Sequence, residues 1–216
     1  MRITISAAVR SFGEIGRDFY SRGWVLGTSG NFSAVLSRKP LLLAITSSGV
    51  SKGTIGRGDI LRVGADGLAV GKGDRRPSAE ALLHLAVVRT RGAGAVLHTH
   101  SVWSTMLSEL HAGDRGLDLH GFEMLKGLEG VRTHDHTERI PILENDQDMP
   151  RLARVVEGTL RASPDSHAFL LRRHGLYTWG DDLAQARRHV EILEFLFETM
   201  ARLQAADTRP GERSWR

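Results

Sequence analysis

Apolar positions along this chain alternate between helical and strand-like spacing. Apolar residues three and four positions apart predict an amphipathic helix from about Ser6 to Ser21. The same spacing predicts further helices over about 77–88, 101–110, 148–160 and 182–204. Short apolar runs predict strands over 32–36, 41–45, 95–100, 140–143, 168–171 and 175–180, and an Asp-Gly turn predicts a hairpin over 59–70.

The length and composition fit one soluble globular domain. The chain has 216 residues, of which 41% are hydrophobic and 25% charged. We expect a single domain over 1–204 and a polar, fraying tail over 205–216. No cysteine, no signal peptide and no apolar run of about 20 residues is present, which favours a cytoplasmic protein without a membrane span.

The formal charge of +4 raises the question of a nucleic-acid partner. The 29 basic residues are interleaved with 25 acidic ones, and the aromatic content of 6% leaves few stacking platforms. A small anionic substrate explains the charge equally well. Nucleic-acid binding is therefore the least favoured class of function.

The most informative stretch is an apolar run, 95–97, that leads into His98-Thr99-His100. On a strand, alternate side chains share a face, so the two imidazoles would lie about 7 Å apart along the backbone. That spacing suits one metal ion. With 10 histidines in the chain, a structural pair formed by chance is the alternative.

Three further features favour a metal. An uncompensated imidazole at the end of a buried strand would be destabilising, His174 follows another apolar run, 168–171, and carboxylates are available at Glu80 and Glu123. Three imidazoles, an open fourth position and a nearby carboxylate describe a catalytic zinc site rather than a structural one. The absence of cysteine excludes a thiolate-rich site.

Two polar loops resemble parts of an anion cradle. The segments 27–31 and 46–49 combine glycines with hydroxyl side chains, and Lys52 follows the second. If the neighbouring strands bring them together, both loops could converge on one phosphate. Ordinary turns are the alternative for either loop alone.

Two other segments have alternative interpretations. Ser78 is a candidate cap for the helix from Pro77, and Glu80 then either stabilises the first turn or faces the metal. The second His-x-His pair, His134 and His136, lies among polar residues, so we interpret it as a solvated connection and predict no second metal there.

An ordered set of motifs resembles the class II aldolase/epimerase superfamily over about residues 6–204. The set is Gly30-Asn31-x-Ser33, Thr46-Ser47-Ser48-Gly49, Pro77-Ser78-x-Glu80, His98-x-His100 and His174-Gly175. The resemblance implies an α/β fold with three layers, α/β/α, around a central, mainly antiparallel sheet. It also implies a homotetramer with active sites at subunit boundaries, and one Zn²⁺ per subunit held by His98, His100 and His174. A phosphorylated ketose would be bound through Asn31, Ser48, Gly49 and Ser78.

Within that superfamily, the middle of the chain is similar to the methylthioribulose-1-phosphate dehydratases of methionine salvage. The similarity lies in the segments 122–127, 140–153 and 174–180. In those dehydratases the carboxylate corresponding to Glu123 is the acid/base of a zinc-assisted loss of water. In the sugar-phosphate aldolases the base corresponds to Glu80. This chain has both, so a sugar-phosphate aldolase or epimerase is the alternative activity.

A non-catalytic module is the rival from another functional class, since the superfamily fold also occurs in cytoskeletal proteins that lack a working metal site. The intact set of His98, His100 and His174 argues against that interpretation.

Overall fold

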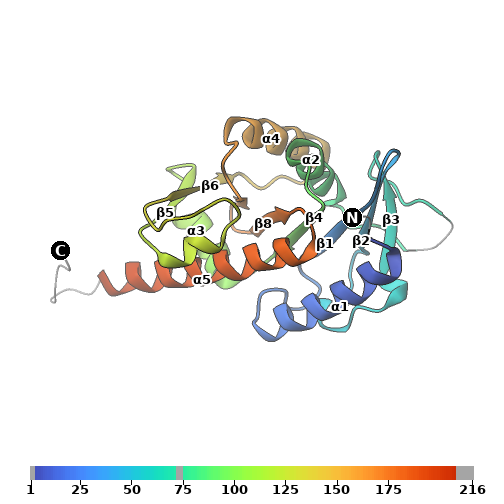
Figure 1. Ribbon diagram of the computed structural model, residues 1–216, viewed down its shortest axis with the longest axis horizontal. Coiled ribbons are helices and arrows are strands. Elements are labelled where there is room, and N and C mark those ends of the chain that lie inside the picture. The colour runs from blue at the N-terminus through green and yellow to red at the C-terminus, as the bar shows by residue number, and fades with distance from the viewer. Residues whose placement is uncertain (1–2, 72–74, 208–216) are drawn as a thin grey trace.

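A mainly antiparallel sheet forms the centre of the protein (Figure 1). The computed structural model describes residues 3–71 and 75–207, and its eight strands lie in the order β3-β2-β1-β4-β8-β7-β6-β5. Among these strands, β6 and β7 are parallel and the other neighbours are antiparallel. The strands are β1 (Asn31–Arg38), β2 (Leu41–Thr46), β3 (Ile60–Gly64), β4 (Ala95–Thr99), β5 (Gly116–His120), β6 (Thr137–Leu143), β7 (Ala168–Leu171) and β8 (Gly175–Gly180).

Helices cover both faces of the sheet, which confirms the predicted three-layer α/β/α fold (Figure 1). One face packs against α1 (Ile5–Ser21), α3 (Val102–Leu110) and α5 (Leu183–Asp207). The other face packs against α2 (Ala81–Arg91) and α4 (Met149–Ala162). Three short 3-10 helices, η1 (Lys52–Thr54), η2 (Arg57–Asp59) and η3 (Glu123–Gly127), lie in the connections.

The alternation of side chains along β4 decides which layer receives the histidines. Ala95 and Leu97 belong to the apolar cluster shared with α1 and α5. Val96 belongs to the cluster shared with α2 and α4. Because alternate residues of a strand point to opposite faces, His98 lies on the same side as Val96, toward α2.

Several element boundaries differ from the sequence-based expectation. The helix expected from Pro77 begins at Ala81, so Ser78 is not its cap, and Glu80 occupies the cap position without a capping hydrogen bond. The second arm of the expected hairpin makes only an isolated bridge, between Val63 and Ala69. Strand β5 was not predicted. The last helix extends to Asp207, and the rest of the expected tail, 208–216, lies outside the described residues.

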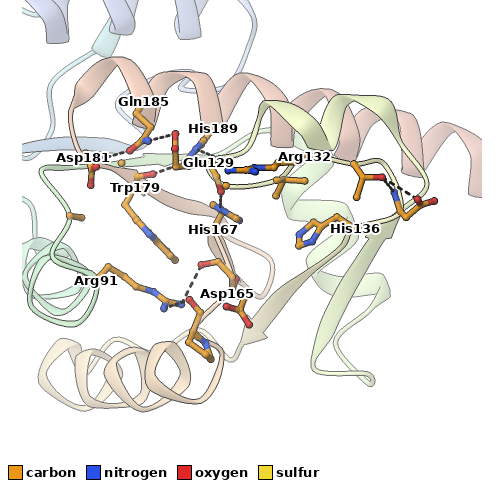
Figure 2. A pocket seen from close by; sticks show the side chains of 18 residues that line it. Arg91, Glu129, Arg132, His136, Asp165, His167, Trp179, Asp181, Gln185 and His189 are labelled. Atoms are coloured by element: carbon orange, nitrogen blue, oxygen red, sulfur yellow. Dashed lines mark hydrogen bonds between the residues drawn. The ribbon is translucent and has the colours of Figure 1, made fainter.

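A pocket of about 750 Å³ opens beside Trp179, at the end of β8 (Figure 2). Because β4 and β8 are antiparallel, with Ala95 opposite Gly180 and Thr99 opposite Leu176, this pocket lies at the end of β4 away from its histidines. No helix among residues 3–71 and 75–207 is long and apolar enough to cross a membrane.

Candidate metal and anion site

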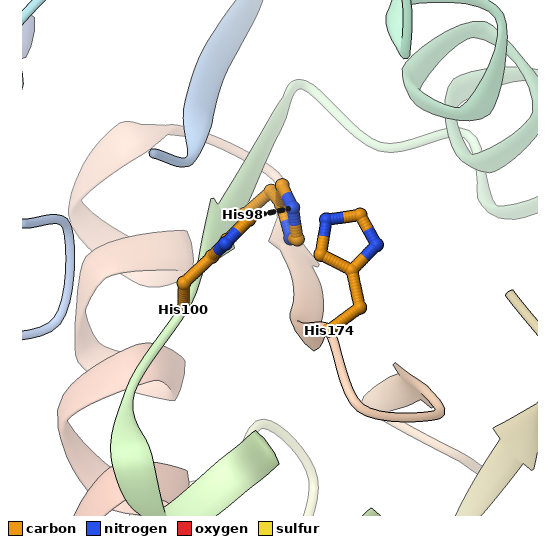
Figure 3. A group of neighbouring side chains, drawn as sticks. All are labelled: His98, His100 and His174. Atoms are coloured by element: carbon orange, nitrogen blue, oxygen red, sulfur yellow. Dashed lines mark hydrogen bonds between the residues drawn. The ribbon is translucent and has the colours of Figure 1, made fainter. Parts of the chain in front are cut away.

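The first two histidines lie at the end of strand β4 (Figure 3). His98 is fully buried, His100 is partly buried, and their Nε2 atoms are 2.7 Å apart. The phenol ring of Tyr177, on the neighbouring strand β8, stacks on the His98 imidazole with the ring centres 3.9 Å apart. The two nitrogens are at hydrogen-bond distance, so the edges of both rings meet at one point.

The third histidine comes from the turn between β7 and β8. His174 lies with its ring centre 4.5 Å from that of His100 (Figure 3). Thr105 on α3 donates a hydrogen bond from Oγ1 to the His174 carbonyl oxygen, at 3.0 Å. At Gly175, a Cβ atom would collide with the carbonyl oxygen of Thr99, so only glycine lets the turn lie this close to β4.

The three side chains fit a divalent metal. One nitrogen from each ring lies within 4.8 Å of the others. The Nδ1 of His98 donates to the carbonyl oxygen of Leu176 at 2.8 Å, which leaves its Nε2 lone pair facing the cluster. The Nδ1 of His174 is buried and has no hydrogen-bond partner. Imidazole nitrogens are common ligands of zinc, so this set of donor atoms suits that metal.

The electrostatics of the cluster favour the ligand form of histidine. Burial lowers the pKa of His98 well below its ordinary value, and the neighbouring His100 and His174 lower it further. Burial likewise lowers the pKa of His100 to about 4 and that of His174, which the charge of Glu80 opposes. The three imidazoles are therefore neutral near pH 7, and only neutral imidazole binds a metal.

Glu80 is the carboxylate that the fold brings to the cluster. Its Oε2 lies 3.5 Å from Nε2 of His98, and its Oε1 lies 3.3 Å from Nε2 of His174. Asn31 donates a hydrogen bond from Nδ2 to Oε2 of Glu80, at 2.6 Å. The start of α2 therefore faces the histidines, and a role of Glu80 at a metal or in catalysis stays a prediction.

The predicted anion-binding residues line one small pocket beside the cluster. This pocket, of about 160 Å³, brings together both polar loops, and its lining includes Asn31, Ser48, Gly49 and Ser78. Lys52 also lines it, almost completely buried, and its Nζ donates to the carbonyl oxygens of two residues, Thr28 and Val50. Burial lowers the pKa of Lys52 to about 8, against the charge of Glu80. The pocket is thus supplied with hydroxyls and a cation, which suit a phosphate.

Glu123 lies apart from this pocket. It begins η3, which packs against α5 on the opposite face of the sheet from His98, and its side chain is 73% exposed. Its Oε1 accepts a hydrogen bond from Lys126 at 2.7 Å, which lowers its pKa. A single chain therefore does not bring Glu123 to the histidines, and its catalytic role stays a prediction.

The site also contains two buried residues that the sequence motifs do not indicate, Tyr177 and His84. Tyr177 is fully buried, and burial together with the charge and the hydrogen bond of Glu80 raises its pKa well above the ordinary value. His84 contacts Asn31 through its Nε2. A signal for His84 was present, because a histidine four residues after Glu80 lies one helical turn further along the same face.

This chain is similar to known enzymes over most of its length. The family model of the class II aldolase and adducin N-terminal domain matches residues 10–201. A protein of Pseudomonas fluorescens named methylthioribulose-1-phosphate dehydratase is 41% identical over 98% of this chain and 100% of its own length. The protein of the same name from Marinobacter nauticus is 43% identical over 89% of this chain and 92% of its own.

This chain belongs to the methylthioribulose-1-phosphate dehydratase family, within the class II aldolases. A solved relative shares the dehydratase family's architecture. L-fuculose-1-phosphate aldolase from Thermus thermophilus superposes with a TM-score of 0.75, covering 95% of this chain and 100% of that one, at 24% sequence identity. At that identity, the likeness supports the fold alone.

Proposed function

We propose that this protein is a zinc-dependent dehydratase that acts on 5-methylthioribulose 1-phosphate in methionine salvage, in the cytoplasm. The observation that carries the proposal is the placement of a three-histidine cluster directly beside a pocket suited to phosphate. Relatives that are 41% and 43% identical bear the name of that dehydratase. The product would be 2,3-diketo-5-methylthiopentyl 1-phosphate plus water.

His98, His100 and His174 would hold one zinc ion per subunit. Bound there, zinc would supply Lewis-acid polarisation of the carbonyl oxygen of the substrate. His98 is prepared for this role because Leu176 fixes the orientation of its ring, and the stacked Tyr177 holds the ring from one side. Tyr177 and the buried β4 also exclude water from behind the cluster.

The phosphate of the substrate would bind in the adjoining pocket. Asn31, Ser48, Gly49 and Ser78 are the predicted partners of its oxygens, and Lys52 would contribute positive charge. Binding one end of the substrate there would place its carbonyl end toward His100, which also lines the pocket. This orientation converts the chemistry into an effectively unimolecular reaction.

The proton transfers require a carboxylate. In the proposal, Glu123 removes the C3 hydrogen as a proton and returns a proton to the departing C4 hydroxyl, so that one water leaves. Since Glu123 lies away from the histidines of its own chain, it would act in a neighbouring subunit of a homotetramer. Support comes from α3, which begins just after His100 and exposes apolar side chains at Val102, Met106 and Leu110.

The experiment that tests the proposal is incubation of the zinc-loaded protein with methylthioribulose 1-phosphate, followed by mass spectrometry. We expect loss of one water and no shorter fragments. A matched sample of His98→Ala should leave the substrate intact. Unchanged substrate with the zinc-loaded wild type would contradict the proposal.

The position of Glu80 favours one second candidate, a sugar-phosphate aldolase or epimerase. Its carboxylate is within 3.5 Å of the His98 and His174 rings, where it could accept a proton from a substrate hydroxyl. Cleavage of a deoxyketose 1-phosphate into two three-carbon fragments, with methylthioribulose 1-phosphate unchanged, would establish the aldolase. Glu80→Gln would then abolish cleavage.

A further inference from the structure

His84 connects the sheet to the anion pocket through hydrogen bonds between side chains. It lies on α2, is fully buried, and sits against β1. Its Nδ1 is 2.7 Å from Oγ of Ser33, and its Nε2 contacts Oδ1 of Asn31. Asn31 in turn donates from Nδ2 to Ser78, at 3.0 Å, and to Glu80, at 2.6 Å.

The direction of these hydrogen bonds follows from the carboxylate at one end. A carboxylate oxygen only accepts, so the group of Asn31 that faces Glu80 is its NH₂ and the group that faces His84 is its carbonyl oxygen. Nε2 of His84 must then carry the proton. Burial lowers the pKa of His84 to about 3, so the ring is neutral, and its bare Nδ1 accepts from the hydroxyl of Ser33.

The consequence is a fixed orientation of the Asn31 amide. If the proton of His84 were on Nδ1, a lone pair on Nε2 would face the carbonyl oxygen of Asn31. The amide would turn over and present its oxygen to Glu80 and to the pocket, where it would repel both the carboxylate and a bound anion. The hydroxyl of Ser33 satisfies the remaining lone pair, on Nδ1, by donating a hydrogen bond to it.

We propose that His84 is a positioning residue, which orients the Asn31 amide so that its N–H groups face Glu80 and the anion pocket. The chain Ser33–His84–Asn31 carries this orientation from the buried sheet to the site. A buried histidine with a purely structural role would stabilise the fold without influencing what the pocket binds. The inference deepens the proposed function. It rests on that function in one respect, namely that the anion bound in the pocket is a phosphate.

The test measures inorganic phosphate binding to the zinc-loaded protein by calorimetric titration. For His84→Leu we expect about tenfold weaker binding, because Asn31 loses the partner that holds its amide toward a charged group. The zinc content should equal that of the wild type. The matched control is His189→Leu, since His189 is also buried and bonded through both ring nitrogens, but lies on α5 beside Trp179. That control should lose stability and bind phosphate normally.

A second measurement covers the case in which His84→Leu does not fold. Nitrogen NMR of the histidine-labelled wild type should show His84 protonated on Nε2. Ser33→Ala should keep His84 protonated on Nε2 and bind phosphate normally, because Glu80 and Asn31 set the direction of the hydrogen bonds. A ring protonated on Nδ1 in the wild type or in Ser33→Ala, or normal phosphate binding by folded His84→Leu, would overturn the inference. Phosphate binding and protonation do not depend on turnover, so failure of the proposed dehydratase activity would leave these results interpretable.

Discussion

Two groups of three histidines lie at opposite ends of the β4–β8 pair, and they differ in what their ring nitrogens contact. The candidate metal-binding group, called the metal cluster below, consists of His98, His100 and His174 (Figure 3). The structural group consists of His136, His167 and His189 (Figure 2). In the structural group, Oε2 of the buried Glu138 accepts from both His136 and His167, at 2.9 Å in each case. His189 is bonded through both nitrogens, to Trp179 and Glu129.

The difference shows why histidine content alone does not identify a metal site. The metal cluster leaves a buried nitrogen of His174 without a partner, and its pKa values are lowered, so its rings are neutral. In the structural group, burial would lower the pKa of His167, but its hydrogen bond and ion pair with Glu138 raise it. A protonated imidazole has no lone pair for a metal. Burial also lowers the pKa of His189, to about 4, but both of its ring nitrogens have hydrogen-bond partners. A buried nitrogen without a partner, as in His174, therefore distinguishes the two groups better than charge does.

The largest expected effect comes from removing one member of each group. His98→Ala should weaken zinc binding by more than about a hundredfold and abolish turnover, because two imidazoles hold zinc far less tightly than three. His136→Ala should retain zinc. Metal analysis after dialysis measures both variants. Equal zinc loss in the two variants would break the distinction between the groups.

Replacing each carboxylate in turn would show which of them acts as the acid/base in the reaction. We expect Glu123→Gln to lower kcat by about 10² to 10⁴ while zinc stays bound, since an acid/base group typically contributes that much. Glu80→Gln is the matched comparison for a carboxylate beside the histidines. Steady-state kinetics with methylthioribulose 1-phosphate decides between them, and near-normal activity of Glu123→Gln would remove its assigned role.

The structural group should matter for stability instead. Glu138→Gln removes the countercharge of His167 and should lower the free energy of unfolding by about 3 kcal/mol, with zinc content unchanged. Burial opposes ionisation of Glu138, but its bonds with His167 and His136 lower its pKa overall. The contribution of the pair is therefore lost as pH falls through the lowered pKa of Glu138, and as pH rises through the raised pKa of His167.

Denaturant unfolding at a series of pH values measures this effect. The wild type should show a maximum between the two ordinary pKa values, 4.5 and 6.5, that Glu138→Gln lacks. An unchanged pH profile in the variant would contradict the assignment of an ion pair.

A smaller effect on stability is expected from Glu194, which is buried behind the metal cluster. Glu194 on α5 is fully buried and accepts a hydrogen bond from Thr99, at 2.9 Å. Burial raises its pKa to about 7, although the hydroxyls of Ser101 and Thr99 act in the opposite direction. A raised carboxyl pKa means that the folded state binds the proton more tightly, so stability falls as pH rises from the unfolded pKa to the folded one.

Glu194→Gln should remove this pH-dependent loss of stability, which corresponds to about 2 to 3 kcal/mol in the free energy of unfolding. Thermal or denaturant unfolding between pH 4.5 and 7.5 compares the slopes of the two proteins. Parallel slopes in wild type and variant would show that Glu194 does not titrate in this range.

Much of the fold could be predicted because its segments are strongly patterned. The apolar runs 168–171 and 175–180 coincide with β7 and β8, and α1 lies where its apolar spacing predicts it. The convergence of the three histidines followed from their places at strand ends. The start of α2 was predicted too early, because Pro77 and Ser78 form a common helix-start pattern, whereas here Ser78 bonds to Asn31 instead of capping.

The rest depended on contacts that a linear pattern does not contain. The partners of His84 lie on β1, far earlier in the chain, and only the packing of α2 on the sheet reveals them. Strand β5 has little apolar alternation beyond Leu117 and Leu119, and its pairing with β6 defines it. If Glu123 acts in a neighbouring subunit, as proposed, its place beside the histidines depends on contacts between chains, which no local sequence pattern contains.

The turn that carries His174 also has a consequence for folding. It joins the end of β7 to β8, whereas His98 and His100 end a strand formed by a much earlier part of the chain. A metal bound to all three would act as a cross-link that closes a long loop, and such closure reduces the entropy of the unfolded chain. Metal supply would then govern how long each molecule survives unfolding and proteolysis, as well as whether it can turn over substrate.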